Sequence, residues 1–248
     1  IFLPTRRACR DAQTAFLRAF EGKPVLLPKL QPLGDIDPDD LTLQLAGFDP
    51  EISEHDLEIP PAISPLHRTL LLTKLVQAKD KGRSADMSVA LAEELGRLMD
   101  NIHTEGLDLA NLPDLVDESM LSKHWQITLE FLTILSEAWP QILKERGVID
   151  AADRRNRLMR LLTQWYEKTK PEEITIAVGT SGSIPATANL LKAISDLPNG
   201  YVVLPGLDQG LSDKDWAAVG PTHPQYSLKQ LLNTLECKPA AVGWAESG

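Results

Sequence analysis

Three arginines and a threonine hydroxyl are concentrated in residues 4–10, directly after a short apolar run. Thr5 can cap the helix that follows, and Arg6, Arg7 and Arg10 surround the first turns of that helix. A helix N-terminus with a hydroxyl and several guanidinium groups is typical of a contact with a phosphate or a DNA backbone. The same residues also fit a solvated helix face on which Arg7 pairs with Asp11 at i,i+4. The segment by itself leaves both interpretations open.

A second group of small polar residues, Gly-Thr-Ser-Gly-Ser at 179–183, separates a predicted strand from a predicted helix. A nucleotide-binding phosphate loop needs a lysine after its second glycine, and this segment has none. A tight turn is therefore the first interpretation. Ser181 and Ser183 are weaker candidates for binding an anion or a DNA backbone at the helix N-terminus.

The residues that NTP hydrolysis requires are missing from the sequence. Gly22 and Lys23 are followed by Pro24, which cannot serve in a phosphate loop. Asp208 follows a predicted strand, but no second acid adjoins it to hold Mg²⁺. We therefore predict that this chain has no catalytic residue, no metal and no cofactor, and that Asp208 lies in a surface turn.

Cysteine and histidine usage also excludes several classes of site. Cys9 and Cys237 are the two cysteines, which fits a reducing, cytoplasmic compartment, and Cys9 is expected to be a partly buried structural thiol. The histidines are scattered without metal-ligand spacing; they are His55, His67, His103, His124 and His223.

The charge balance limits how the protein meets nucleic acid. Its 248 residues include 25 Lys and Arg against 35 Asp and Glu, a net charge of −10. General electrostatic binding of DNA would need a basic surplus, so any DNA contact must be local. No apolar run reaches the roughly 18 residues of a membrane span.

The termini of the sequence show strand–helix–strand patterns, which predict a parallel sheet. Near the N-terminus we expect a strand at 1–3, a helix to about 21 ended by Gly22, and a strand at 25–27. Near the C-terminus we expect strands at 174–178 and 201–204 around a helix that begins at Pro185, then a helix at 227–235. Ile1 stands within an apolar run, so we interpret the chain as a piece of a longer protein.

The middle of the sequence has the 3.6-residue period of helices. Residues 34–65 resemble an acidic connector with one short helix near 39–46. Helices follow at 66–79, 84–103, 123–146 and 151–168, and Pro140 must kink or restart the third. A second basic group, Arg154, Arg155, Arg157 and Arg160, is expected on a solvated helix face.

These elements predict an α/β fold interrupted by an all-helical insertion. The α/β domain would be discontinuous, comprising residues 1–64 and 171–237. The insertion would span 65–170, and residues 238–248 would form a disordered tail.

An ordered set of segments resembles the N-terminal region of the AddB family, subunits of the AddAB helicase–nucleases. The segments are 2–10 (Phe-Leu-Pro-Thr-Arg-Arg-Ala-Cys-Arg), 27–35, 124–126 with Phe131, 139–140, 155–158, 179–187 (Gly-Thr-Ser-Gly-Ser-Ile-Pro-Ala-Thr), 202–208 and 223–226. The resemblance covers residues 1 to about 235.

The resemblance implies a superfamily I helicase-like domain of P-loop NTPase type that has lost its motor function. The family processes double-strand DNA ends for recombinational repair, with an AddA-like helicase–nuclease subunit as partner. Residues 4–7 would match the helicase motif that touches single-stranded DNA. A segment for a phosphate loop would precede Ile1, and the family's nuclease part is absent from this sequence, so no catalytic residue is carried over.

Two other functions stay open at this point. The first is an acidic protein-interaction module that docks the partner helicase subunit without binding DNA itself. The second is an NTPase whose phosphate loop lies outside the sequence, which the lack of paired acids near Asp208 disfavours.

Overall fold

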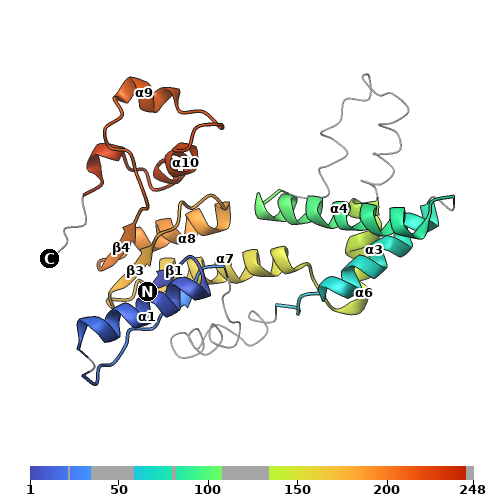
Figure 1. Cartoon of the computed structure of the whole chain (residues 1–248), viewed down its shortest axis with the longest axis horizontal. Coiled ribbons are helices and arrows are strands. Elements are labelled where there is room, and N and C mark those ends of the chain that lie inside the picture. The colour runs from blue at the N-terminus through green and yellow to red at the C-terminus, as the bar shows by residue number, and fades with distance from the viewer. Residues whose placement is uncertain (22, 35–58, 80–81, 108–133, 244–248) are drawn as a thin grey trace. The chain divides into compact units, whose positions relative to one another are not determined.

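The computed structural model describes residues 1–21, 23–34, 59–79, 82–107 and 134–243 (Figure 1). The chain divides into two compact units. One combines Ile1–Leu57 with Leu158–Gly248, and the other is Glu58–Arg157. The expected short helix at 39–46 lies outside the described residues, as does the part of the expected third helix before residue 134.

The first unit is built on a four-stranded parallel sheet, so the predicted α/β class with a parallel sheet is confirmed. Its strand order is β2-β1-β3-β4. The strands are β1 (Phe2–Leu3), β2 (Gln31–Pro32), β3 (Thr175–Val178) and β4 (Gly200–Val203). The two central strands come from the two ends of the chain, and Phe2 pairs in register with Ala177.

The second strand differs from the prediction, because residues 25–27 form no strand and β2 lies four residues further on. The N–H groups of Gln31 and Leu33 donate to the carbonyls of Ile1 and Leu3 at 2.9 and 2.7 Å. Pro32 fits between them because an edge strand leaves every second N–H unpaired. The apolar run at 25–27 is largely exposed, so burial did not select it as a strand.

Helices α1 (Arg6–Ala19) and α8 (Pro185–Ser195) make the two crossovers of this sheet. Thr5 caps α1 as predicted, since its hydroxyl accepts the Ala8 N–H at 3.1 Å. The crossovers run in opposite directions along the sheet, and right-handed crossovers then place their helices on opposite faces. Figure 1 shows α1 on one side of the strands and α8 on the other.

Helix α7 (Ala151–Thr169) belongs to both units. Its C-terminal half packs in the α/β unit, where the rings of Tyr166 and Phe2 meet edge to face with centroids 6.1 Å apart. The Thr187 hydroxyl of α8 also approaches the Met159 sulfur at 3.5 Å. The insertion was expected to end at residue 170, whereas the contacts divide the chain inside α7, before Leu158.

The C-terminal part of the α/β unit holds α9 (Asp213–Ala218), α10 (Tyr226–Thr234) and the 3-10 turn η5 (Pro239–Ala241). The sequence reading omitted α9, although Ser212 caps it through the Asp215 N–H. Residues 239–242 were expected to be disordered, but the Gln209 side chain donates to the Val242 carbonyl at 2.6 Å. Residues 244–248 lie outside the described residues.

The second unit is helical. It contains α3 (Pro65–Lys79), α4 (Ala85–Thr104), the π-helical turn η4 (Ile134–Ala138) and α6 (Trp139–Arg146). The change from η4 to α6 occurs one residue before Pro140, so the predicted interruption at this proline is confirmed. Its core includes the buried side chains of Leu72, Val76, Met99, Leu135 and Trp139. Among the described helices, none is long and apolar enough to cross a membrane.

Candidate nucleic-acid interface

The strand order of the sheet changes direction between β1 and β3, which makes this position a topological switch point. The chain moves from β1 through α1 to β2 on one side, and from β3 through α8 to β4 on the other. In open α/β sheets the crevice at the carboxyl ends of strands beside such a reversal is the usual ligand site. The two predicted site segments follow β1 and β3 directly, so both lie at this edge.

Direct packing joins these two segments. Gly179 has a φ of +77°, and a Cβ built on it would lie 3.4 Å from Cγ of Pro4. The Gly179 N–H also donates to the Val203 carbonyl at 3.0 Å, which extends the β3–β4 ladder. The structure therefore brings Thr5, Arg6, Arg7 and Arg10 to the same edge of the sheet as Ser181 and Ser183. Sequence spacing alone did not show this.

On the α1 side, the three arginines are exposed. Arg7 Nε lies 3.9 Å from Asp11 Oδ2, with side chains 90% and 75% exposed, and such pairs contribute little. The predicted i,i+4 pair thus exists but does not hold Arg7 away from a ligand. The Thr5 hydroxyl oxygen is engaged as the cap of α1, so the main role of Thr5 is to fix the start of the helix that carries the arginines.

On the β3 side, residues 179–183 form a bent loop rather than the predicted tight turn, because no backbone hydrogen bond closes this segment. Gly182 has a φ of +59° and donates its N–H to the Thr180 hydroxyl at 3.3 Å. A Cβ at Gly182 would lie 2.7 Å from Leu231 of α10, so the loop packs tightly on that helix. Ser181 is half-buried and Ser183 is exposed. Neither serine hydroxyl has a hydrogen-bond partner within the described residues.

The start of α8 completes this edge. Its N-cap residue is Ile184, which offers no side-chain cap, and Pro185 has no N–H to satisfy. The N–H groups of the first turn of α8 therefore receive no side-chain cap from the N-cap residue, and uncapped N–H groups of this kind bind anions at helix N-termini. The edge combines guanidinium groups, hydroxyls and backbone N–H donors, which suits phosphate oxygens.

The charge of this part of the chain differs from that of the whole. Residues 4–10, which lie at this edge, contain three arginines and no Asp or Glu, although the full sequence carries −10. The excess positive charge is thus local, as the sequence argument requires of a nucleic-acid contact.

Asp208 lies in a surface turn. It is exposed, its Oδ1 accepts the Gly210 N–H at 2.9 Å, and its own N–H donates to the Gln225 side chain at 3.1 Å. The Gln225 amide also donates to the Gly206 carbonyl. Gln225 thereby holds a surface turn, as predicted for Asp208. No group of three His, Cys, Asp or Glu side chains in the described part of the chain could hold a metal ion.

The second basic group is only partly a solvated face: Arg157 and Arg160 are exposed, as predicted, whereas Arg154 and Arg155 are half-buried, which corrects the prediction for these two. Arg154 Nε donates to the Pro60 carbonyl at 3.2 Å, and Arg155 donates to the Thr104 hydroxyl at 3.1 Å. Arg157 pairs with Asp153 at 2.8 Å. Burial lowers the pKa of Arg155, while nearby Asp100 acts in the opposite direction. Arg154 and Arg155 thus connect α7 to other parts of the helical unit and do not form a basic face for DNA phosphates.

Sequence reasoning missed a buried ionic cluster in the helical unit. Asp150 is 1% exposed; it accepts a hydrogen bond from Trp139 Nε1 at 2.9 Å and lies 2.9 Å from Arg68 Nε. His103 Nε2 is 3.5 Å from the same carboxylate. Burial would raise the pKa of Asp150, but the contacts with His103, Arg68 and Trp139 outweigh it and lower the pKa. The sequence signal for this cluster was Asp150 itself, which directly precedes the amphipathic helix α7. An aspartate in that position resembles an ordinary helix cap.

Cys9 and two of the histidines complete the set of residues considered from the sequence. Cys9 is buried and free, in agreement with a structural thiol. His55 and His124 lie outside the described residues.

Comparisons with protein-family models, with curated proteins and with solved structures return no match.

Proposed function

We propose that this chain is a non-catalytic, helicase-like fragment of a double-strand break repair helicase–nuclease subunit, and that it contributes to binding single-stranded DNA. In this proposal the α/β unit is an inactivated P-loop NTPase-like fold related to the AddB family. Arg6, Arg7 and Arg10 contact the DNA backbone, with Ser181 and Ser183 as additional donors.

The observation that carries the proposal is the meeting of two chain segments at the reversal of the sheet. Exposed arginines after β1 and donor-rich residues after β3 share one edge, in a chain whose net charge is otherwise strongly negative. The parallel α/β sheet is compatible with a P-loop-like fold. The choice of an AddB-related DNA-processing complex in this proposal rests on the sequence resemblance.

Fluorescence anisotropy of a labelled single-stranded oligonucleotide tests this proposal with the full 248-residue chain. We expect saturable binding that weakens as salt rises. The double variant Arg6→Ala with Arg7→Ala should bind more weakly. If both arginines contact phosphates, the slope of log K against log salt should fall by about 1.4, since each phosphate contact contributes roughly 0.7 for single strands.

A matched control removes the same charge elsewhere. Arg97→Ala with Arg146→Ala changes two exposed arginines of the helical unit and should leave the salt slope unchanged. An equal loss of oligonucleotide affinity in both double variants would show that binding depends only on the net charge of the chain. Unchanged affinity and slope in the Arg6 and Arg7 variant would contradict the proposed contact.

A second candidate function rests on an uncovered part of the sheet. Ile176 and Val178 are in register with Tyr201 and Val203, so these side chains share one face of β3 and β4. Tyr201 is 55% exposed, and Ile174, next on the same side, is 68% exposed. Parallel sheets are usually covered on both faces. An apolar face in an acidic chain favours docking of the AddA-like helicase subunit without DNA binding.

Copurification distinguishes the two functions. The interaction module predicts a stable complex with the helicase subunit that Tyr201→Glu disrupts, together with no DNA binding by the chain alone. The DNA-contact proposal predicts oligonucleotide binding that Tyr201→Glu leaves intact and that the Arg6 and Arg7 changes weaken.

A further inference from the structure

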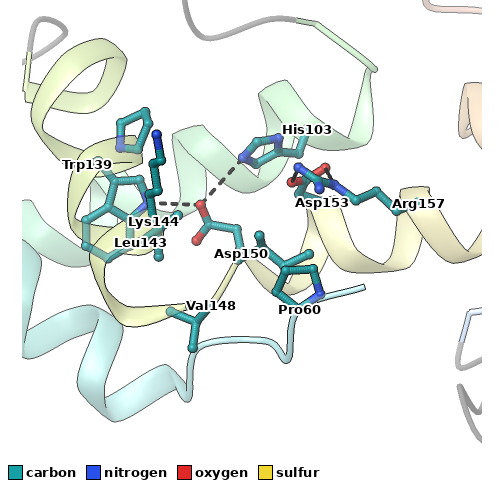
Figure 2. Close-up of a pocket in the computed structure, with 12 residues that line it drawn as sticks. Pro60, His103, Trp139, Leu143, Lys144, Val148, Asp150, Asp153 and Arg157 are labelled. Carbon is teal, nitrogen blue, oxygen red and sulfur yellow. Dashed lines mark hydrogen bonds and ion pairs between the residues drawn. The ribbon is translucent and has the colours of Figure 1, made fainter. Parts of the chain in front are cut away.

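A cavity of about 380 Å³ opens in the helical unit, beside the buried Asp150 cluster (Figure 2). Trp139, Leu143 and Lys144 of α6 lie on one side of Asp150 in this view, and His103, Asp153 and Arg157 lie on the other. Pro60, Pro140 and Val148 complete much of the apolar lining. The volume is within the range of small-molecule sites, which are largely apolar with a few placed polar groups.

Backbone hydrogen bonds fix the segments around residues 61–63 and 149 that lie beside this cavity. Ile63 N–H donates to the Ile149 carbonyl at 2.9 Å, and Ile149 N–H donates to the Pro61 carbonyl at 3.1 Å. Gly147 ends α6 with a φ of 62°, so the chain turns sharply into the segment 148–150. The cavity is therefore defined by paired backbone and a helix end rather than by loose side chains.

Most charged groups around the cavity are already paired. Asp150 has Trp139, Arg68 and His103 as neighbours, and Arg68 also binds Asp100 at 2.9 Å. Arg157 binds Asp153 through both Nε and Nη2. Asp150 and Asp153 are thus poor sites for a cationic ligand.

Lys144 is the exception among the charged lining residues. It is exposed, and its ammonium group makes no hydrogen bond or ion pair with any described residue. An ammonium group that no described residue pairs with, at the edge of an apolar cavity, favours a ligand that carries a negative charge. An apolar body in the cavity and an anionic group at Lys144 would satisfy both features.

We propose that this cavity binds a small molecule with a compact apolar body and a single anionic group, with Lys144 as the residue that selects the charge. The site lies within the helical unit, and its ligand is independent of the proposed DNA contact. A ligand there would touch α6, the end of α4 and the start of α7, because all three line the cavity.

Two probes of the same shape test the proposal: 2-naphthoate, which is anionic, and 2-naphthamide, which is neutral. Isothermal titration and saturation-transfer NMR with the full chain should show tighter binding of naphthoate. Lys144→Gln should weaken naphthoate roughly two- to fivefold, the range of a partly exposed ion pair, and leave naphthamide unchanged. Val148→Phe should block both probes by filling the cavity.

Lys74→Gln is the matched control, since Lys74 is an exposed lysine of α3 that does not line the cavity. It should change neither affinity. Absence of binding by both probes at millimolar concentration would overturn the proposal. Equal naphthoate binding by the native chain and Lys144→Gln would also overturn it, and that test stands even if Val148→Phe fails to fold, because Lys144 is exposed.

Discussion

Replacing Asp150 by asparagine keeps the size of this buried side chain and removes its charge. The carboxylate lies 2.9 Å from Arg68 Nε and accepts a hydrogen bond from Trp139 Nε1. The amide oxygen of the introduced asparagine could still accept the Trp139 hydrogen bond. The substitution therefore acts mainly on the guanidinium of Arg68, which would lose one of its two carboxylate partners.

The expected loss in the free energy of unfolding depends on which partners Arg68 retains after the substitution. Removing one partner of a buried ion pair usually costs about 3–5 kcal/mol. Arg68 would retain Asp100 at 2.9 Å and the Gly96 carbonyl at 3.1 Å. We therefore expect the lower end, about 3 kcal/mol in the free energy of unfolding of the helical unit.

Native-state hydrogen exchange of core amides in α4, such as those of Met99 and Ile102, measures this unit separately from the sheet. Asp153→Asn is the control, since it removes a carboxylate three residues away that pairs with the more exposed Arg157. It should cost about 1 kcal/mol or less. Similar small losses in both variants would refute the reasoning that Asp150 compensates a buried charge.

The same variant has a defined pH dependence. Burial favours the neutral form of Asp150, but its contacts with His103, Arg68 and Trp139 dominate and lower its pKa. A carboxyl with a lowered folded pKa contributes stability above its unfolded pKa of about 3.9 and loses it as pH falls further. The stability difference between the native chain and Asp150→Asn should thus be constant above about pH 5 and shrink below pH 4.

Three further outcomes are expected from thermal unfolding of the α/β unit. Gly200→Ala should prevent stable folding, because the new Cβ would lie 1.7 Å from the Ile194 carbonyl oxygen. Gly34→Ala is the control and should be close to neutral, because the nearest atom to its new Cβ would be 3.9 Å away. Thr5→Ala should cost about 1 kcal/mol through loss of the α1 cap, and a native-like melting temperature would contradict that role. Phe2→Ala should cost about 3–5 kcal/mol, since this buried ring joins β1 to α7; a loss below about 1 kcal/mol would show that the contact is not part of the core.

Local sequence signals predicted the elements whose causes are local. Thr5 offers a cap to the helix that follows it, and a proline cannot occupy a helix interior without interrupting its hydrogen bonds. Both features are present in the structure at α1 and at Pro140. The strand at residues 174–178 was also predictable, because a short run of β-branched and apolar residues bounded by a glycine turn suits a buried strand.

The sequence failed where the cause was a long-range contact. Residues 25–27 are more apolar than residues 31–32, yet the backbone hydrogen bonds of Ile1 and Leu3 go to the segment around Pro32. The segment that becomes β2 is the one whose backbone can hydrogen-bond to the edge of β1, and the β-propensity of its residues does not determine this. Arg154 and Arg155 were misjudged for the same reason, since their partners Pro60 and Thr104 are far away in sequence.

The amino-acid sequence by itself determined the α/β class, the helical interruption and the candidate arginines, because period, capping and composition are properties of neighbouring residues. Only the tertiary structure decided that β1 and β3 lie side by side, so that Arg6 and Ser183 share one edge, and that Asp150 is buried against Arg68. The pairing of segments from opposite ends of the chain is selected by burial and backbone hydrogen bonding over the whole fold, which no local pattern encodes.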